Sequence, residues 1–269
     1  MAVSISHGGD GVDKLKKHLW CFFFYKGGPS MYKRVLLKLS GESLKDLDHQ
    51  SIFDVDHLEH ITDMVKKLHD NGVEVAIVTG AGNIWRGKLA DSIGIEPVHA
   101  DFMGMLGTVI NSVAMASNLK KKGVDSIVYS AVPEIKDVTI AYNKDLANKS
   151  LSEGKVVFLA GGTGKPFFTT DTAAALRAIE LDCKAILVGK NGVDGIYTDD
   201  PNKNAKAEFI KTITFKEILE RKLQVMDLSA IELIKNSNID VRVFSMADPD
   251  NFLRVANGEE IGTTVKKGE

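Results

Sequence analysis

The sequence predicts an α/β fold, a three-layer sandwich in which helices cover both faces of a mainly parallel central sheet. Apolar runs of strand length alternate with helix-length segments along the chain, and this alternation is typical of parallel sheets. A glycine-rich or polar loop follows four of the predicted strands, at residues 40–43, 80–87, 161–171 and 189–200. Because ligands bind at the carboxyl ends of parallel strands, these loops predict a site at one edge of the sheet.

The predicted strands are short and apolar, and they cover residues 33–39, 73–78, 124–129, 155–160, 184–188 and 239–244. The predicted helices cover residues 56–70, about 105–121, 172–180, 215–223 and 229–236. In the first helix Asp56 and Glu59 resemble a capping box, and Asn71-Gly72 ends the helical pattern. Residues 44–54 are polar and predict a loop.

The composition is that of an ordinary globular protein: 269 residues, 44% of them hydrophobic and 26% charged. The formal net charge of −2 gives no indication of nucleic-acid binding. Two cysteines, Cys21 and Cys183, make neither a disulfide framework nor a metal-spaced cluster, which fits the reducing cytoplasm where we expect the protein. We expect no membrane contact, because no apolar run has transmembrane length.

Residues 1–30 differ in character from the remainder. Their aromatic run at 19–25 is too short for a signal sequence and lacks a cleavage site. A non-native leader or upstream start, a disordered arm and a docking segment are all compatible with it. We favour a leader, because a well-formed domain begins at Met31, and we expect this domain to extend over residues 31–269.

The loop at 161–171 has the composition of a ligand-binding loop. Its glycines allow backbone N–H groups to approach a ligand closely, and its hydroxyls before a helix N-terminus suit an anion. Phe167 and Phe168 supply an apolar wall. A plain glycine turn is the alternative interpretation. The loop is not a P-loop, because Leu159 and Pro166 stand where that motif requires Gly and Ser or Thr.

Charged residues beside these loops are candidates for phosphate chemistry. Lys38 lies in an apolar strand, so it points into a polar cleft unless the strand is an edge strand from which it snorkels. Arg86 suits bidentate phosphate binding, or is a solvated loop residue. Asp171 has three possible roles: it orders Lys38, holds a metal, or caps the following helix. The histidines are scattered and predict no triad and no metal site.

Three further aspartates have alternative interpretations. Asp101 starts the second long helix, as a cap or as an acceptor for a ribose hydroxyl. Asp194 fits a turn beside Gly195. Asp200-Pro201 is a typical turn start and also a candidate nucleotide contact.

The combined motifs resemble those of bacterial uridylate (UMP) kinases, members of the amino acid kinase superfamily. The similarity covers residues 31–266 in unbroken order. It is carried by Lys38-Leu-Ser-Gly-Glu42, Gly80-Ala-Gly-Asn83 with Arg86-Gly87, Asp101-Phe-Met-Gly-Met-Leu106, Thr163-Gly-Lys-Pro-Phe-Phe-Thr-Thr-Asp171, Val193-Asp-Gly195 with Asp200-Pro201, and Val225-Met-Asp-Leu228.

The resemblance implies an amino acid kinase-like fold and the reaction of ATP with UMP to give ADP and UDP, with Mg²⁺ accompanying ATP and no separate metal site. It also implies a homo-oligomer, a hexamer built from dimers. The residues that match catalytic positions are Lys38, Arg86 and Asp171. The matching ATP positions are Lys38, Leu39, Ser40, Gly41, Gly82, Arg86, Asn191, Tyr197 and Asp200. The matching UMP positions are Ala81, Asp101, Thr163, Gly164, Lys165, Pro166, Phe167, Phe168, Thr169 and Thr170, with the phenylalanines against uracil.

Three positions depart from the family pattern: Ala81 replaces a glycine, Lys165 an asparagine, and Gly192 a lysine, with Lys190 two residues earlier. The last leaves open which basic residue joins Lys38 and Arg86 at ATP. Two other functions compete: a superfamily kinase acting on a carboxylate or carbamate, and a nucleotide sensor or storage protein without turnover. The phenylalanines and Asp101 favour a nucleoside acceptor over a small acid.

Overall fold

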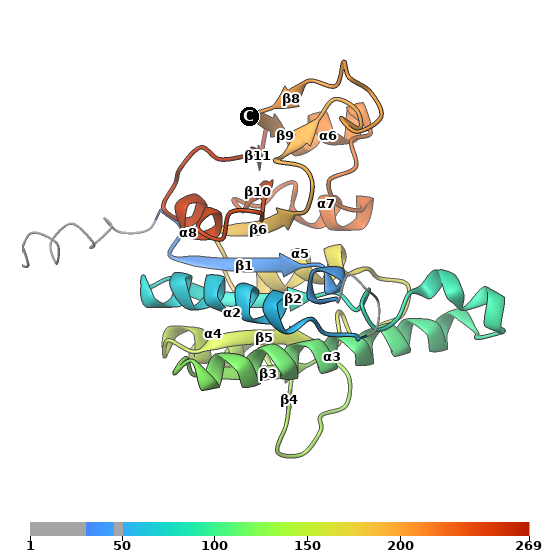
Figure 1. Cartoon of the computed structure of the whole chain (residues 1–269), viewed down its shortest axis with the longest axis vertical. Coiled ribbons are helices and arrows are strands. Elements are labelled where there is room, and N and C mark those ends of the chain that lie inside the picture. Colours follow the sequence, from blue (N-terminus) through green and yellow to red (C-terminus); the bar gives the residue numbers. More distant parts are fainter. Residues whose placement is uncertain (1–30, 46–50, 269) are drawn as a thin grey trace, which may run out of the picture.

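The computed structural model of the chain describes residues 31–45 and 51–268. Its centre is a nine-stranded sheet with the order β4-β3-β5-β2-β1-β6-β10-β11-β9 (Figure 1). The strands are β1 Arg34–Leu39, β2 Glu74–Thr79, β3 Ser126–Ser130, β4 Ile140–Ala141, β5 Val156–Ala160, β6 Ala185–Lys190, β9 Thr212–Thr214, β10 Asp240–Ser245 and β11 Thr263–Lys266. Only the β10–β11 pair is antiparallel among the described strands of this sheet. The mainly parallel sheet is confirmed.

A separate two-stranded hairpin, β7 Ile196–Tyr197 with β8 Phe209–Ile210, stands beside the sheet. The predicted leader over residues 1–30 lies outside the described residues, as do residues 46–50 of the loop predicted over 44–54.

Helices cover both faces of the sheet, so the predicted three-layer arrangement is confirmed (Figure 1). One layer contains α2 Val55–Asp70, α3 Pro97–Lys121 and α8 Asn251–Ala256. The other contains α4 Lys144–Ser152, α5 Thr170–Glu180, α6 Phe215–Arg221 and α7 Leu228–Ile234. Side chains alternate along β1, so Leu37 and Leu39 join the first core while Leu36 joins the second.

Helix α3 begins at Pro97, well before the predicted start near residue 105. Proline suits the first helical position because its missing N–H would have no partner there. Contrary to expectation, α3 is long and apolar enough to cross a membrane by length and composition. Of its apolar window, 56% is buried inside the protein, which identifies α3 as a core helix.

The capping box expected at Asp56 is wrong. Helix α2 begins one residue earlier, and Asp54 caps it by accepting a hydrogen bond from the N–H of His57. A complete capping box occurs instead at α6, where Thr214 and Glu217 satisfy each other's backbone N–H groups.

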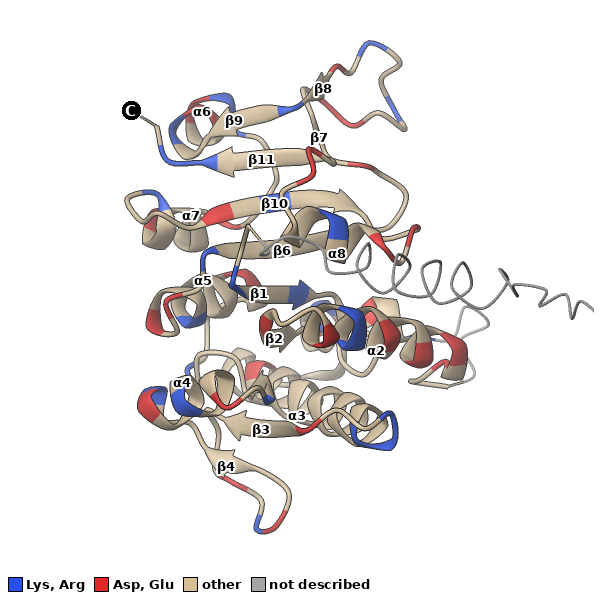
Figure 2. Ribbon diagram, turned by 90° about the vertical axis from the view of Figure 1, so that its left-hand side faces the viewer, with Lys and Arg blue, Asp and Glu red and all other residues tan. Residues whose placement is uncertain are grey.

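Charges of both signs are distributed over the outer helices and loops, while the central strands carry few (Figure 2). On the side of the molecule shown in Figure 2, positively and negatively charged residues are intermixed. Any anionic ligand must therefore be held by local charges.

Arg34 joins several elements at the amino end of the central strand, opposite the glycine loops. Its side chain is only 16% exposed. The guanidinium donates to Glu74 on β2 at 2.5 Å, to Asn148 on α4 at 2.6 Å, and to the carbonyl of Leu181 after α5 at 2.7 Å. This one side chain thus holds a strand and two helices of the second layer in place.

We predict that Arg34→Met lowers the free energy of unfolding by about 3 kcal/mol, because it leaves Glu74 and two polar groups without their charged donor. Lys33→Met is the matched control, since Lys33 is 83% exposed and lies 3.9 Å from the same Glu74. Urea denaturation measures both. Equal midpoints for the two variants would show that Arg34 contributes no more than a surface charge.

Candidate active site

The four predicted ligand loops follow β1, β2, β5 and β6, which are neighbours in the sheet. Their carboxyl ends therefore meet at one edge, as predicted. The first two loops touch through their backbones. A Cβ on Gly41 would lie 2.6 Å from both the carbonyl oxygen of Gly80 and the nitrogen of Gly82. Only glycine fits at position 41, so this contact fixes how closely the loops approach.

Two buried asparagines fasten the second glycine loop to helix α3. Asn111 donates to the carbonyl of Gly80 at 2.8 Å. Asn83, the last residue of the Gly80-Ala-Gly-Asn motif, exchanges hydrogen bonds with Asn111 at 2.8 and 3.0 Å. Because buried amides are costly to leave unpaired, this pair holds the loop in a single conformation.

Lys38 and Asp171 form an ion pair at the centre of this edge. The Nζ atom of Lys38 lies 2.7 Å from Oδ1 of Asp171, and both side chains are about four-fifths buried, with 18% and 21% exposed. Strand β1 lies between β2 and β6, so the interpretation of Lys38 as a snorkelling edge residue is wrong. Asp171 does not cap α5, because Thr169 accepts the hydrogen bonds from the first N–H groups of the helix.

Asp227 contacts Asp171 and helps to hold the ion pair in place. The sequence analysis quoted its motif, Val225-Met-Asp-Leu228, but did not assign Asp227 a role. Its carboxylate accepts from the hydroxyls of Thr169 and Thr172 and from the N–H of Ala230. Its own N–H donates to Oδ2 of Asp171 at 3.3 Å. The N-termini of α5 and α7 are thereby joined next to the lysine.

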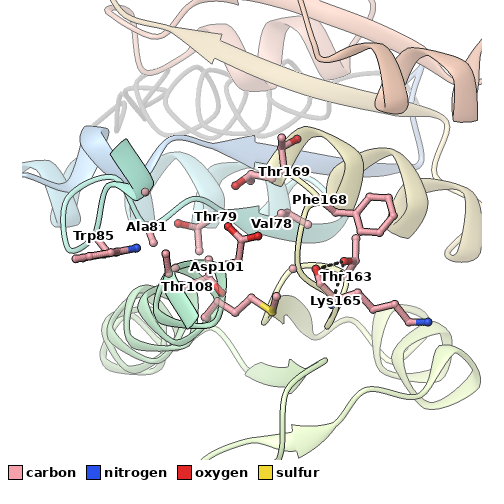
Figure 3. A pocket seen from close by; sticks show the side chains of 16 residues that line it. Val78, Thr79, Ala81, Trp85, Asp101, Thr108, Thr163, Lys165, Phe168 and Thr169 are labelled. Carbon is pink, nitrogen blue, oxygen red and sulfur yellow. Dashed lines mark hydrogen bonds between the residues drawn. The ribbon is translucent and has the colours of Figure 1, made fainter. Parts of the chain in front are cut away.

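On the β2 side of β1 lies a cavity of about 260 Å³ between the loops of β2 and β5 and helix α3 (Figure 3). Seven predicted UMP positions line it: Ala81, Asp101, Thr163, Lys165, Phe168, Thr169 and Thr170. Gly164, Pro166 and Phe167 are not among the lining residues. Trp85 and Thr108 also line it, and the sequence interpretation did not assign them to the site.

Asp101 lies in the middle of this cavity (Figure 3). It does not start the helix, since α3 already begins at Pro97, and it accepts a hydrogen bond of 2.7 Å from the N–H of Phe167. That bond ties the Phe-Phe loop to α3. Phe167 is 72% exposed, so the expected wall of two phenylalanine rings is the ring of Phe168 alone.

Ala81, which replaces a family glycine, is accommodated by another glycine. A Cβ on Gly107 of α3 would lie 2.8 Å from the Cβ of Ala81. The methyl group of Ala81 therefore occupies the space that Gly107 leaves open.

On the β6 side of β1 lies a cavity of about 540 Å³ beside the β7–β8 hairpin. Tyr197 and Asp200, two of the predicted ATP positions, line it, as does Lys190. The ring of Tyr197 packs edge-on against Phe209, and its hydroxyl donates to Asp194 at 2.5 Å. This hydrogen bond raises the pKa of Tyr197 above its usual value.

The remaining predicted ATP positions do not line this cavity. Asn191 is exposed and is not among the residues lining that cavity. The side chain of Leu39 lies in the core, so only its backbone can face a ligand. Ser40 caps the short turn at Gly41–Leu44. Arg86 lies 2.7 Å from Glu42 in an ion pair whose partners are both more than half exposed, so the pair is easily broken.

Residues 33–245 match the sequence pattern described as "Amino acid kinase family". The chain belongs to the amino acid kinase family. Within that family, the uridylate kinase of Streptococcus thermophilus is 45% identical over 234 residues, which cover 87% of this chain and 95% of that protein. The uridylate kinase of Mycoplasma capricolum is 45% identical over 236 residues, covering 87% and 98%.

A solved amino acid kinase structure is also similar throughout. The UMP kinase from Bacillus anthracis gives a TM-score of 0.85 at 39% identity, covering 88% of this chain and 97% of that one. The predicted resemblance to bacterial uridylate kinases is confirmed.

We predict that Gly41→Ala separates the two glycine loops and lowers turnover by about a hundredfold, because displacements near 1 Å at a reacting centre have effects of this size. Gly268→Ala is the control, since a Cβ there meets Thr214 at an ordinary 3.7 Å. Steady-state kinetics and thermal melts compare the variants. Full turnover in Gly41→Ala would show that loop contact is not required.

Proposed function

We propose that this protein is a UMP kinase that reversibly transfers the γ-phosphoryl group of ATP to UMP, giving ADP and UDP for pyrimidine nucleotide synthesis in the cytoplasm. The observation that carries the proposal is that Lys38, paired with Asp171, lies on β1 between β2, whose loop lines one cavity, and β6, whose end lines the other. A phosphoryl donor and an acceptor in these cavities would direct their phosphates at the same ammonium group.

The arrangement suits this reaction because phosphoryl transfer needs positioning and charge neutralisation, and no nucleophilic side chain. In the proposed mechanism Lys38 neutralises the oxygens of the group in transfer, and Asp171 holds Lys38 in place. The backbone N–H groups of the loops at Gly41 and Gly82 bind phosphate oxygens. Arg86 exchanges its exposed partner Glu42 for a phosphate.

The acceptor cavity favours a nucleoside over a small amino acid. Phe168 offers a ring for the uracil, and Trp85 adds a second aromatic wall across the cavity (Figure 3). Asp101 supplies a carboxylate for the ribose hydroxyls. A site for aspartate or acetylglutamate would need no aromatic walls, and Lys165, which also lines the cavity, does not distinguish the two classes of acceptor.

We expect Mg²⁺ to bind together with ATP. The described residues contain no group of three or more His, Cys, Asp or Glu that could hold a metal by themselves. A Mg²⁺ bound through phosphates and waters needs only one or two carboxylates. Asp171 would be that carboxylate, sharing its Oδ1 with Lys38 and its Oδ2 with the N–H of Asp227. When bound, the ion would supply further neutralisation of phosphate charge.

We further propose that the protein is a homo-oligomer, a hexamer as the family resemblance implies. Support comes from an apolar stripe on α3, in which Phe102, Leu106 and Ile110 follow one another at four-residue spacing and are 37%, 54% and 46% exposed. A stripe of this kind is typical of a helix face that packs against another subunit.

The function is tested by measuring ADP release from ATP–Mg²⁺ with UMP, CMP, dUMP, acetylglutamate and aspartate in separate assays. We expect strong turnover with UMP alone. Lys38→Ala should lower turnover at least about a hundredfold, because it removes the charge facing the transferred group, while calorimetry still detects UMP binding. Nucleotide binding by the wild type without turnover on any acceptor would instead identify a sensor.

Oligomerisation is tested by Leu106→Glu, which places a charge in the centre of the α3 stripe. We expect the mass measured by light scattering to fall below that of the wild type, because an unpaired charge is costly in an apolar interface. Ile179→Glu is the control, since Ile179 is an exposed apolar residue, 38% accessible, on helix α5. An unchanged mass in Leu106→Glu would exclude this stripe as a subunit contact.

A further inference from the structure

Lys190, the last residue of β6, reaches the edge of the sheet beside Lys38. Strand β6 lies beside β1 and runs parallel to it (Figure 1), and Val188 is the register partner of Lys38. Side chains alternate along a strand, so Lys190 lies on the same face of the sheet as Val188 and Lys38. Helix α5, which carries Asp171, covers this face. The register therefore gathers two lysines and one carboxylate at one place.

Among the described residues, Lys190 has no hydrogen-bond or ion-pair partner for its ammonium group, although it is half-buried. The other lysines that line the cavity beside the β7–β8 hairpin are exposed. One of them, Lys203, is paired with Asp200 at 3.0 Å. Burial and then the charge of Lys38 lower the pKa of Lys190, while Asp171 opposes this effect. A half-buried cation beside another cation is unfavourable unless a ligand neutralises it.

The backbone explains why the charge is carried at 190 and not at 192. Gly192 has φ of +78°, a left-handed conformation that side chains rarely adopt. A lysine at 192 would be strained there, whereas Lys190 has the regular backbone of a strand. Position 190 is thus the place at this end of β6 where a basic side chain fits without backbone strain.

We propose that Lys190 is a second phosphate-binding residue, which contacts the ATP phosphates together with Lys38. This role rests on the proposed function and extends it by naming a second basic residue that binds the phosphates. Lys190 lines the cavity that contains Tyr197 and Asp200, so it approaches the phosphates from the nucleotide side. Lys38 and Asp171 form their ion pair at the neighbouring strand.

The test compares Lys190→Met, which keeps the length of the side chain but removes its charge, with Lys184→Met. Lys184 is exposed at the opposite end of β6, so the control loses the same charge far from the site. In Lys190→Met we expect kcat/KM for ATP to fall about 10- to 100-fold, the effect of losing a charged hydrogen bond. The KM for UMP should change less than about twofold, and Lys190→Arg should recover most of the loss.

Stability separates a binding role from a structural one. Without nucleotide, Lys190→Met should melt at or above the temperature of Lys184→Met, because it removes an unpaired, half-buried charge. The proposal is wrong if kcat/KM for ATP is unchanged in Lys190→Met, or if this variant melts well below the control.

A separate measurement keeps this proposal independent of the assigned reaction. If the wild type shows no turnover with UMP, the proposed function fails, and Lys190 is judged by calorimetric titration with ATP–Mg²⁺. At least about tenfold weaker binding by Lys190→Met than by Lys184→Met would support the role. Equal affinities would overturn it.

Discussion

The candidate active site is organised around one lysine in the middle of an apolar sheet, whose charge must be neutralised. Lys38 lies on the central strand with β2 and β6 on either side, so its ammonium cannot reach solvent sideways. Burial of an unpaired ammonium is costly, and Asp171 removes that cost at 2.7 Å. The carboxylate is itself held by the N–H of Asp227. This ion pair and the hydrogen bonds of Asp227 together therefore position the ends of β1, α5 and α7 relative to one another.

The same edge brings the two cavities close together. Gly41 allows two loops to touch through their backbones, and Asn111 fixes the carbonyl of Gly80. The loops can then present backbone N–H groups at fixed positions, which avoids reorganisation during the reaction. Rigidity here comes from close backbone packing and buried amides, while the exposed Arg86–Glu42 pair remains free to exchange partners.

Much of this could be predicted from the sequence, because its strongest signals are local. Apolar runs located the six main strands to within about two residues, and glycine-rich loops identified the edge where ligands bind. The elements that were not predicted are short and gave weak signals: β4, β7 and β8 have two residues each, β9 has three, β11 has four and α8 has six. Helix α4 exposes most of its residues, so it lacks a broad apolar stripe.

Other features depend on contacts between residues that are distant in the chain. The role of Asp101 required knowing that α3 starts at Pro97 and that the Phe167 N–H lies beside it. The pairing of Asn83 with Asn111 depends on how α3 packs against the loop. Neither contact leaves a pattern of spacing that sequence reasoning can detect.

The charged neighbours of Lys190 could not be predicted from the sequence either. In the sequence it is one lysine among many in a chain whose charges nearly balance. Register with β1 places it on the face that carries Lys38 and Asp171, where two positive charges meet one negative charge. Coulomb interactions are stronger in less polar surroundings. The excess of one positive charge at this half-buried place therefore matters more to an anionic ligand than the nearly neutral net charge of the chain. An anion bound there would neutralise the charge that folding left uncompensated, so the phosphate binding that we propose would follow from strand register.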